Sequence, residues 1–163
     1  MELQTYQAKL EAAYQGEFYG IAMYRRIAEA RTSPDEARKW QLLTQLEEET
    51  RAVLEPLLHR HGMMTEPLAE SLNAGEADAE NYKHLSWAGL MRRFSDELDE
   101  DIAEYTALLD LAPAEDRAAI RFLVHHEIVA KAFCESELNG NAAHSTEPVE
   151  ALIASAPGLL AAS

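Results

Sequence analysis

The stretch TSPDEARKWQLLTQLE, residues 32–47, carries the strongest local signal in this 163-residue chain. Ser33 suits the N-cap of a helix, Pro34 suits its first position, and Glu36 can complete a capping box with Ser33. The apolar residues that follow recur in steps of three and four, which is the spacing of one helix face. We therefore predict a helix from residue 34 to about residue 61, ended by Gly62. Its inward face comprises Trp40, Leu43, Glu47, Thr50, Leu54 and Leu57.

Two pairs of glutamates share one spacing along the chain. The separation between Glu17 and Glu47 equals that between Glu97 and Glu127, so the two halves align with Glu97 on Glu17 and Glu127 on Glu47. The same alignment matches Tyr14 with Phe94, Trp40 with Ile120, Leu43 with Leu123, and Arg51 with Lys131. We therefore predict two helical hairpins with one glutamate at the same depth on each of four helices. Carboxylates from four helices meeting at one level form the skeleton of a di-metal site in a helix bundle.

The remaining periodicity places three more long helices, at about residues 3–31, 86–111 and 114–138, with Ser86 as a possible N-cap. The pattern is interrupted over residues 62–85, which include Pro67, Asn73 and Gly75. This connection is long enough to cross the bundle. Within it, residues 68–72 could form one helical turn. Such a crossover leaves the second and third long helices parallel. The tail, residues 139–163, contains one short helical candidate at 148–154. The predicted fold class is all-α, in a single domain over residues 1–163.

Composition and charge exclude several classes of protein. The formal net charge is −15, which argues against binding to nucleic acid or to anionic membranes because both need a basic surface. The N-terminal residues lack a secretory signal pattern, and the apolar segment 151–162 is too short to span a bilayer. The single cysteine, Cys134, allows no internal disulfide, so we expect a cytoplasmic protein with Cys134 buried and unreactive.

Two helical hairpins joined by a long crossover, with inward glutamates, resemble the ferritin-like superfamily, and most closely rubrerythrin and its relatives. The resemblance covers about residues 3–138 and implies an antiparallel four-helix bundle followed by a short C-terminal helix. Glu17 is followed seven residues later by Tyr24, as in that family. Glu47 and Glu127 occupy the positions of the Glu in two Glu-x-x-His motifs. The implied metal ligands are Glu17, Glu47, Glu97 and Glu127.

The chain departs from the family at both histidines of these motifs. Thr50 and Ala130 stand where the family has His, so the di-metal site is predicted to be eroded. None of the six histidines is predicted to replace them. His126 lies about 100° around the helix from Glu127, and we predict that it packs on the helix flank, beside Phe122, Val129 and Phe133. We expect that flank to contact the C-terminal segment or a second subunit.

Buried carboxylates repel one another and must be neutralised, whether by metal, by protons or by cationic side chains. Arg51 is four residues after Glu47, and Lys131 is four residues after Glu127, in matching places of the two halves. Side chains at this spacing are neighbours on a helix. One hypothesis is that Arg51 and Lys131 partly replace the charge of the metal. The alternative is a pair of ordinary intrahelical contacts at the bundle edge.

The sequence offers two candidates for the inward acidic residue of the third long helix. The alignment of the two halves favours Glu97, with Glu100 nearby, whereas the apolar stripe of that helix favours Asp101. Asp101, Thr50 and Tyr24 are expected to lie next to the glutamates.

Two functions follow from these expectations. The first is a ferritin-like bundle with an eroded site, without standard di-iron redox activity and with a structural or interaction role. The second is a carboxylate-rich oxidoreductase or metal-binding protein of the rubrerythrin-like class. No cofactor is expected under the first, whereas the second would use iron or manganese at a non-standard carboxylate site. Pairing into a homodimer is expected only by analogy with the family.

Overall fold

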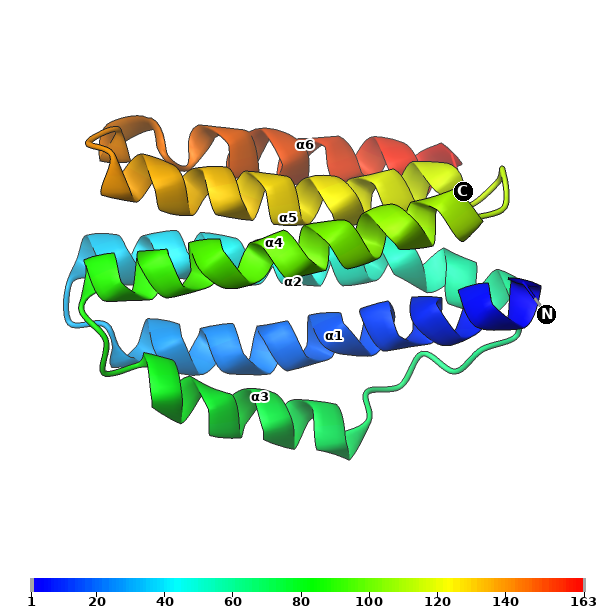
Figure 1. Ribbon diagram of the computed structural model, residues 1–163, viewed down its shortest axis with the longest axis horizontal. Helices are drawn as coiled ribbons and strands as arrows, with labels where there is room; N and C mark the ends of the chain where they lie inside the picture. The colour runs from blue at the N-terminus through cyan, green and yellow to red at the C-terminus, as the bar shows by residue number, and fades with distance from the viewer. Residues whose placement is uncertain (1, 163) are drawn as a thin grey trace.

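The structure is a computed structural model that describes residues 2–162, and these residues form helices and connections without a strand (Figure 1). The elements are α1 (Glu2–Ala30), α2 (Pro34–Arg60), α3 (Ala69–Tyr82), α4 (Trp87–Leu111), α5 (Arg117–Leu138), a short 3-10 turn (Ala142–His144) and α6 (Glu147–Ala162). The predicted all-α class is confirmed. No helix in this part of the chain is long and apolar enough to cross a membrane.

The helix ends follow the local signals of the sequence. The Ser33 hydroxyl accepts a hydrogen bond from the Glu36 amide at 3.4 Å, and the Ser86 hydroxyl accepts one from the Gly89 amide at 3.1 Å. Gly62 follows α2 with a φ of 66°, a left-handed conformation that favours glycine. These caps were predicted, and the structure confirms them.

The long helices form two hairpins, α1 with α2 and α4 with α5 (Figure 1). The chain crosses the length of the molecule between them, so α2 and α4 run in the same direction, as predicted. The prediction of an irregular crossover is wrong, because it contains the 14-residue helix α3 packed along α1. Gly75 permits this close packing, since a Cβ there would meet the carbonyl oxygen of Tyr19. We predicted a break from Pro67, Asn73 and Gly75, but only Pro67 lies outside the helix.

The C-terminal helix is also longer than the predicted segment 148–154. α6 runs from Glu147 to Ala162, continues past Pro157, and packs against α2 and α5. It buries Val149 and Ala156 completely, and the flank of α5 that includes Phe122 belongs to the same apolar cluster as Ala156 and Leu152. This packing gives α5 neighbours on several sides, and it therefore widens the buried face of that helix.

The core consists of two apolar clusters separated along the bundle axis. One cluster gathers residues near the start of α1, the end of α2 and the end of α4, including Tyr6, Leu10, Leu54, Leu58 and Leu108. The other gathers residues from the opposite ends of these helices and from the later turns of α5, including Ile27, Trp40, Leu90, Met91 and Phe133. The middle turns of the helices lie between these clusters, and the buried residues Glu17, Glu47 and Glu127 are found there.

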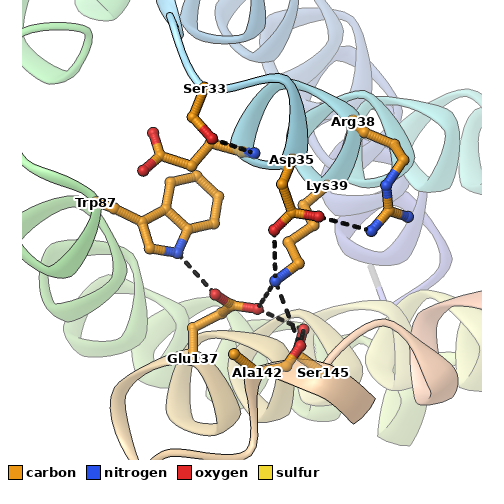
Figure 2. Close-up of polar contacts among 9 residues, drawn as sticks. Ser33, Asp35, Arg38, Lys39, Trp87, Glu137, Ala142 and Ser145 are labelled. Atoms are coloured by element: carbon orange, nitrogen blue, oxygen red, sulfur yellow. Dashed lines mark hydrogen bonds and ion pairs between the residues drawn. The ribbon is translucent and has the colours of Figure 1, made fainter.

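A buried ion pair holds one end of the bundle together (Figure 2). The Lys39 ammonium donates to a Glu137 carboxylate oxygen at 2.7 Å, and the two side chains are only 7% and 4% exposed. The other oxygen of Glu137 accepts from Trp87 Nε1 at 2.8 Å, and the Ser145 hydroxyl also donates to Glu137. The network joins α2, α4 and α5 to the segment that leads into α6.

Candidate metal centre

Three of the four predicted glutamates lie inside the middle layer of the bundle. Glu17 on α1, Glu47 on α2 and Glu127 on α5 are 2%, 6% and 7% exposed. The fourth, Glu97 on α4, is exposed, where it accepts hydrogen bonds from Arg93 and Tyr82. The structure therefore brings three carboxylates inside and leaves Glu97 at the edge.

His126 is the residue that the sequence interpretation misplaced. It is 2% exposed, with Nε2 3.2 Å from Glu47 Oε1 and Nδ1 3.6 Å from Glu17 Oε2. The prediction of a packed flank histidine assumed that only one narrow face of α5 points inward. Because α5 packs against α2, α4 and α6, adjacent residues 126 and 127 are both buried.

Thr50 orients the imidazole of His126. Its hydroxyl donates to the carbonyl oxygen of Leu46 at 2.8 Å, so a hydroxyl lone pair remains for His126 Nδ1, which lies 2.9 Å away. In this arrangement His126 Nδ1 donates to Thr50, and Nε2 faces Glu47. A ligand histidine commonly has its second nitrogen held in this way, which fixes its tautomer and its ring orientation.

The positions of Glu17, Glu47 and His126 fit a bound metal ion. One possible ligand atom from each residue lies within 4.8 Å of the others. Nitrogen and oxygen ligands bind ions such as zinc at about 2.0–2.2 Å, so neighbouring ligand atoms on one ion lie about 3–4 Å apart. Glu17 Oε2 is buried and has no hydrogen-bond partner within residues 2–162. A buried oxygen without a partner is costly, and a cation at this point would satisfy it.

The same residues hold protons when no metal is bound. Burial, followed by the negative charges of Glu47 and Glu127, raises the pKa of Glu17 well above its usual value. Burial also raises the pKa of Glu127 to about 8, although His126 opposes the shift. For His126, burial lowers the pKa, but the carboxylates of Glu127 and Glu47 outweigh it and raise the value to about 9. A metal ion would therefore compete with protons for this site.

Gly20 makes room for the carboxylate of Glu47. It lies one helical turn after Glu17 on α1, and a Cβ at this position would overlap the Glu47 carboxylate group. The glycine thus allows the side chain of Glu47 to pass against the backbone of α1 and reach His126. The sequence pattern places Gly20 on the inward stripe of α1 but does not reveal this role.

A pocket of about 310 Å³ lies over the carboxylates. Glu17, Glu47, Glu127 and Asp101 contribute to its lining, and so does Glu97. Asp101 is partly buried, and burial, together with the charges of Glu104 and Glu47, raises its pKa to about 6. Both candidate acids of α4 therefore line the pocket, and Asp101 is the more buried of the two while Glu97 is the more exposed. Tyr24 also lines the pocket, as expected for a residue near the glutamates.

The hypothesis that Arg51 and Lys131 neutralise the glutamates is wrong. Arg51 donates to Glu55 at 2.6 Å and to the Tyr14 hydroxyl at 3.3 Å, and Lys131 pairs with Asp99. Among residues 2–162, no hydrogen bond or ion pair joins either cation to Glu47 or Glu127. The four-residue step rotates each side chain about 40° towards the edge of the bundle, where its charge stays near water.

Cys134 is buried at 2% exposure, which confirms its predicted place in the core, and burial raises the pKa of its thiol to about 12. A scan against protein-family models and searches of curated proteins and of solved structures found no match to this chain.

Proposed function

We propose that this protein is a ferritin-like helical bundle that binds one divalent metal ion, Mn²⁺ or Fe²⁺, through Glu17, Glu47 and His126. The observation that carries the proposal is the position of His126 Nε2, directed at Glu47 while Nδ1 is held by Thr50. Two carboxylates and one imidazole suit these two ions, which accept both oxygen and nitrogen ligands. The two hairpins and the long crossover support the ferritin-like arrangement.

One ion is a better match to these residues than two. The chain has Thr50 and Ala130 at the positions where the family has its two motif histidines, and His126 supplies a single imidazole from a different position. Glu97, which would be a ligand in a complete di-metal site, is held outside by Arg93 and Tyr82. The site is therefore a rearranged form of the family arrangement, built around a histidine next to Glu127.

A second function is favoured by the protonation of the same residues. With the pKa of His126 raised to about 9, its imidazolium can pair with Glu47 and neutralise the cluster without metal. The protein would then be a structural or interaction module that keeps the bundle and has no metal. The two functions differ in one measurable property, which is whether a divalent ion displaces protons from His126 and the glutamates.

Titration of metal-free protein with Mn²⁺ tests the proposal. We expect one ion per chain, with release of protons on binding because a ligand histidine must be neutral and ligand carboxylates ionised. Replacement of His126 by Gln should lower the affinity at least about 10–100-fold, as observed when residues that shape a metal site are removed. The matched control is His125→Gln, since His125 is the exposed neighbour on the same helix.

The structural function is supported instead if metal-free protein takes up no Mn²⁺ or Fe²⁺ and its unfolding is unchanged by either ion. Equal affinities for the His125→Gln and His126→Gln proteins would show that any bound metal lies elsewhere.

A further inference from the structure

The lining of the pocket includes polar groups that have no hydrogen-bond or ion-pair partner within residues 2–162. The Glu127 carboxylate is 7% exposed, and Asp101 is partly buried beside it in the pocket lining. Within residues 2–162, no hydrogen bond or ion pair engages either carboxylate. The hydroxyls of Tyr24 and Tyr105, which line the same pocket, also lack a hydrogen-bond partner in this part of the chain. Tyr24 and Glu127 are the two most buried of these groups, at 6% and 7% exposure, and buried polar groups are normally satisfied, which favours a ligand that can donate hydrogen bonds.

The walls of the pocket are aromatic. The ring of Phe94 packs edge-on against Tyr24, with centroids 5.5 Å apart, and lies tilted against Tyr82, with centroids 5.2 Å apart. No Lys, Arg or His side chain belongs to the lining described for this pocket. Carboxylates at the base and aromatic faces at the sides both attract a cation, and an organic cation can use both together.

The mouth of the pocket already shows this kind of contact. The Arg93 guanidinium lies over the ring of Tyr82, 4.6 Å from its centroid, and Arg93 Nε donates to Glu97 at 2.9 Å. A cationic side chain thus meets an aromatic face and a carboxylate at the entrance. Tyr24, Asp101 and Glu127 line the same pocket, and within residues 2–162 neither acid forms an ion pair with Lys or Arg.

We propose that this pocket binds a small aliphatic primary amine, with its ammonium group at Asp101 and Glu127 and its carbon chain against Tyr24 and Phe94. The volume of about 310 Å³ is near the lower end of the range for small-molecule sites, roughly 300–1,000 Å³, which favours a short ligand. Glu17 and Glu47 of the metal triad line the same pocket, whereas the acids assigned to the ammonium group, Asp101 and Glu127, are not among the three proposed metal ligands. The amine site is therefore tested on metal-free protein.

Titration of metal-free protein with 1,4-diaminobutane tests the amine site, with 1,4-butanediol as the neutral ligand of similar length. We expect one diamine per chain, weaker binding at high salt, and no binding of the diol. Asp101→Asn and Glu127→Gln should each weaken diamine binding at least tenfold. Asp110→Asn on α4 and Glu135→Gln on α5 make the same charge change at exposed positions and should leave binding unchanged.

Three results would overturn the amine site: no diamine binding, equal binding of the diol, or full affinity in both the Asp101→Asn and Glu127→Gln proteins. Circular dichroism of each variant establishes that it is folded. Uptake of two Mn²⁺ ions with exclusion of the diamine would assign the pocket acids to metal and refute the amine proposal. Diamine binding without Mn²⁺ binding would refute the metal function and leave the amine site standing.

Discussion

Replacement of Gly20 by alanine should disturb the metal centre without removing a ligand. A Cβ at residue 20 would overlap the carboxylate of Glu47, which is the flexible end of its side chain and can move aside. Moving it separates Glu47 Oε1 from His126 Nε2, now 3.2 Å apart. The effect should therefore be concentrated on the contact between Glu47 and His126.

The magnitude follows from two opposing terms. Glycine in the interior of a helix is about 1 kcal/mol less favourable than alanine, so the substitution by itself stabilises α1. Loss of a hydrogen bond to a charged group costs about 1.5–3 kcal/mol. The Gly20→Ala protein should thus be less stable by about 0.5–2 kcal/mol, and its Mn²⁺ affinity should fall about 10–100-fold, as for other changes that misplace a ligand.

Gly16→Ala is the matched control, one turn earlier on the same helix. A Cβ at residue 16 would lie 3.5 Å from the Tyr105 hydroxyl oxygen, which is an ordinary contact. This variant should keep its metal affinity and gain up to about 1 kcal/mol of stability in urea unfolding. If Gly20→Ala matches Gly16→Ala in both stability and Mn²⁺ binding, the reasoning about the position of Glu47 is refuted.

Three further predictions concern charge. The folded-state pKa values of His126 and Glu127, about 9 and about 8, exceed the usual values of 6.5 and 4.5. Metal-free protein should therefore be most stable at mildly acid pH and lose stability as pH rises through 8–9. Thermal unfolding measured from pH 5 to 10 checks this, and a flat profile would contradict it. Glu137→Gln leaves Lys39 buried without its main partner and should cost about 3–5 kcal/mol in urea unfolding; a loss below about 1 kcal/mol would argue against a buried pair. Arg51→Met should cost no more than about 1 kcal/mol, because that side chain is 29% exposed and pairs at the edge; a sharp loss of stability would restore the idea that it neutralises the core.

Much of the fold could be predicted because its signals are local. The cap at Ser33 and the stop at Gly62 depend on a few adjacent residues, and the helix stripes follow from the spacing of apolar positions. α3 was missed because Asn73 and Gly75 are weak helix formers, and their penalty is outweighed by packing against α1. Tertiary packing of this kind cannot be recognised from the segment alone.

The candidate site was predictable only in part. The alignment of the two halves correctly placed Glu17, Glu47 and Glu127 in the interior, since an inward position repeats with helix geometry. It also selected Glu97, whose carboxylate is held outside by contacts with Arg93 from the preceding turn and with Tyr82 from α3. The orientation of one acid thus depends on a helix that was not predicted.

His126 was missed because its role depends on which helices surround α5. One signal was available: Phe122 and Phe133 share its side of the helix, and a histidine among large apolar residues is buried and needs a partner. The partner itself, Glu47, belongs to the other half of the sequence and could be found only from the arrangement of α2 and α5.

The most direct measurement is pulsed electron paramagnetic resonance of the protein loaded with one equivalent of Mn²⁺. The proposed centre predicts a magnetic coupling between Mn²⁺ and a histidine nitrogen, which is retained in the His125→Gln protein and lost in the His126→Gln protein. Bound Mn²⁺ without a nitrogen coupling, or with a coupling that survives His126→Gln, would contradict the assignment of His126 as a ligand.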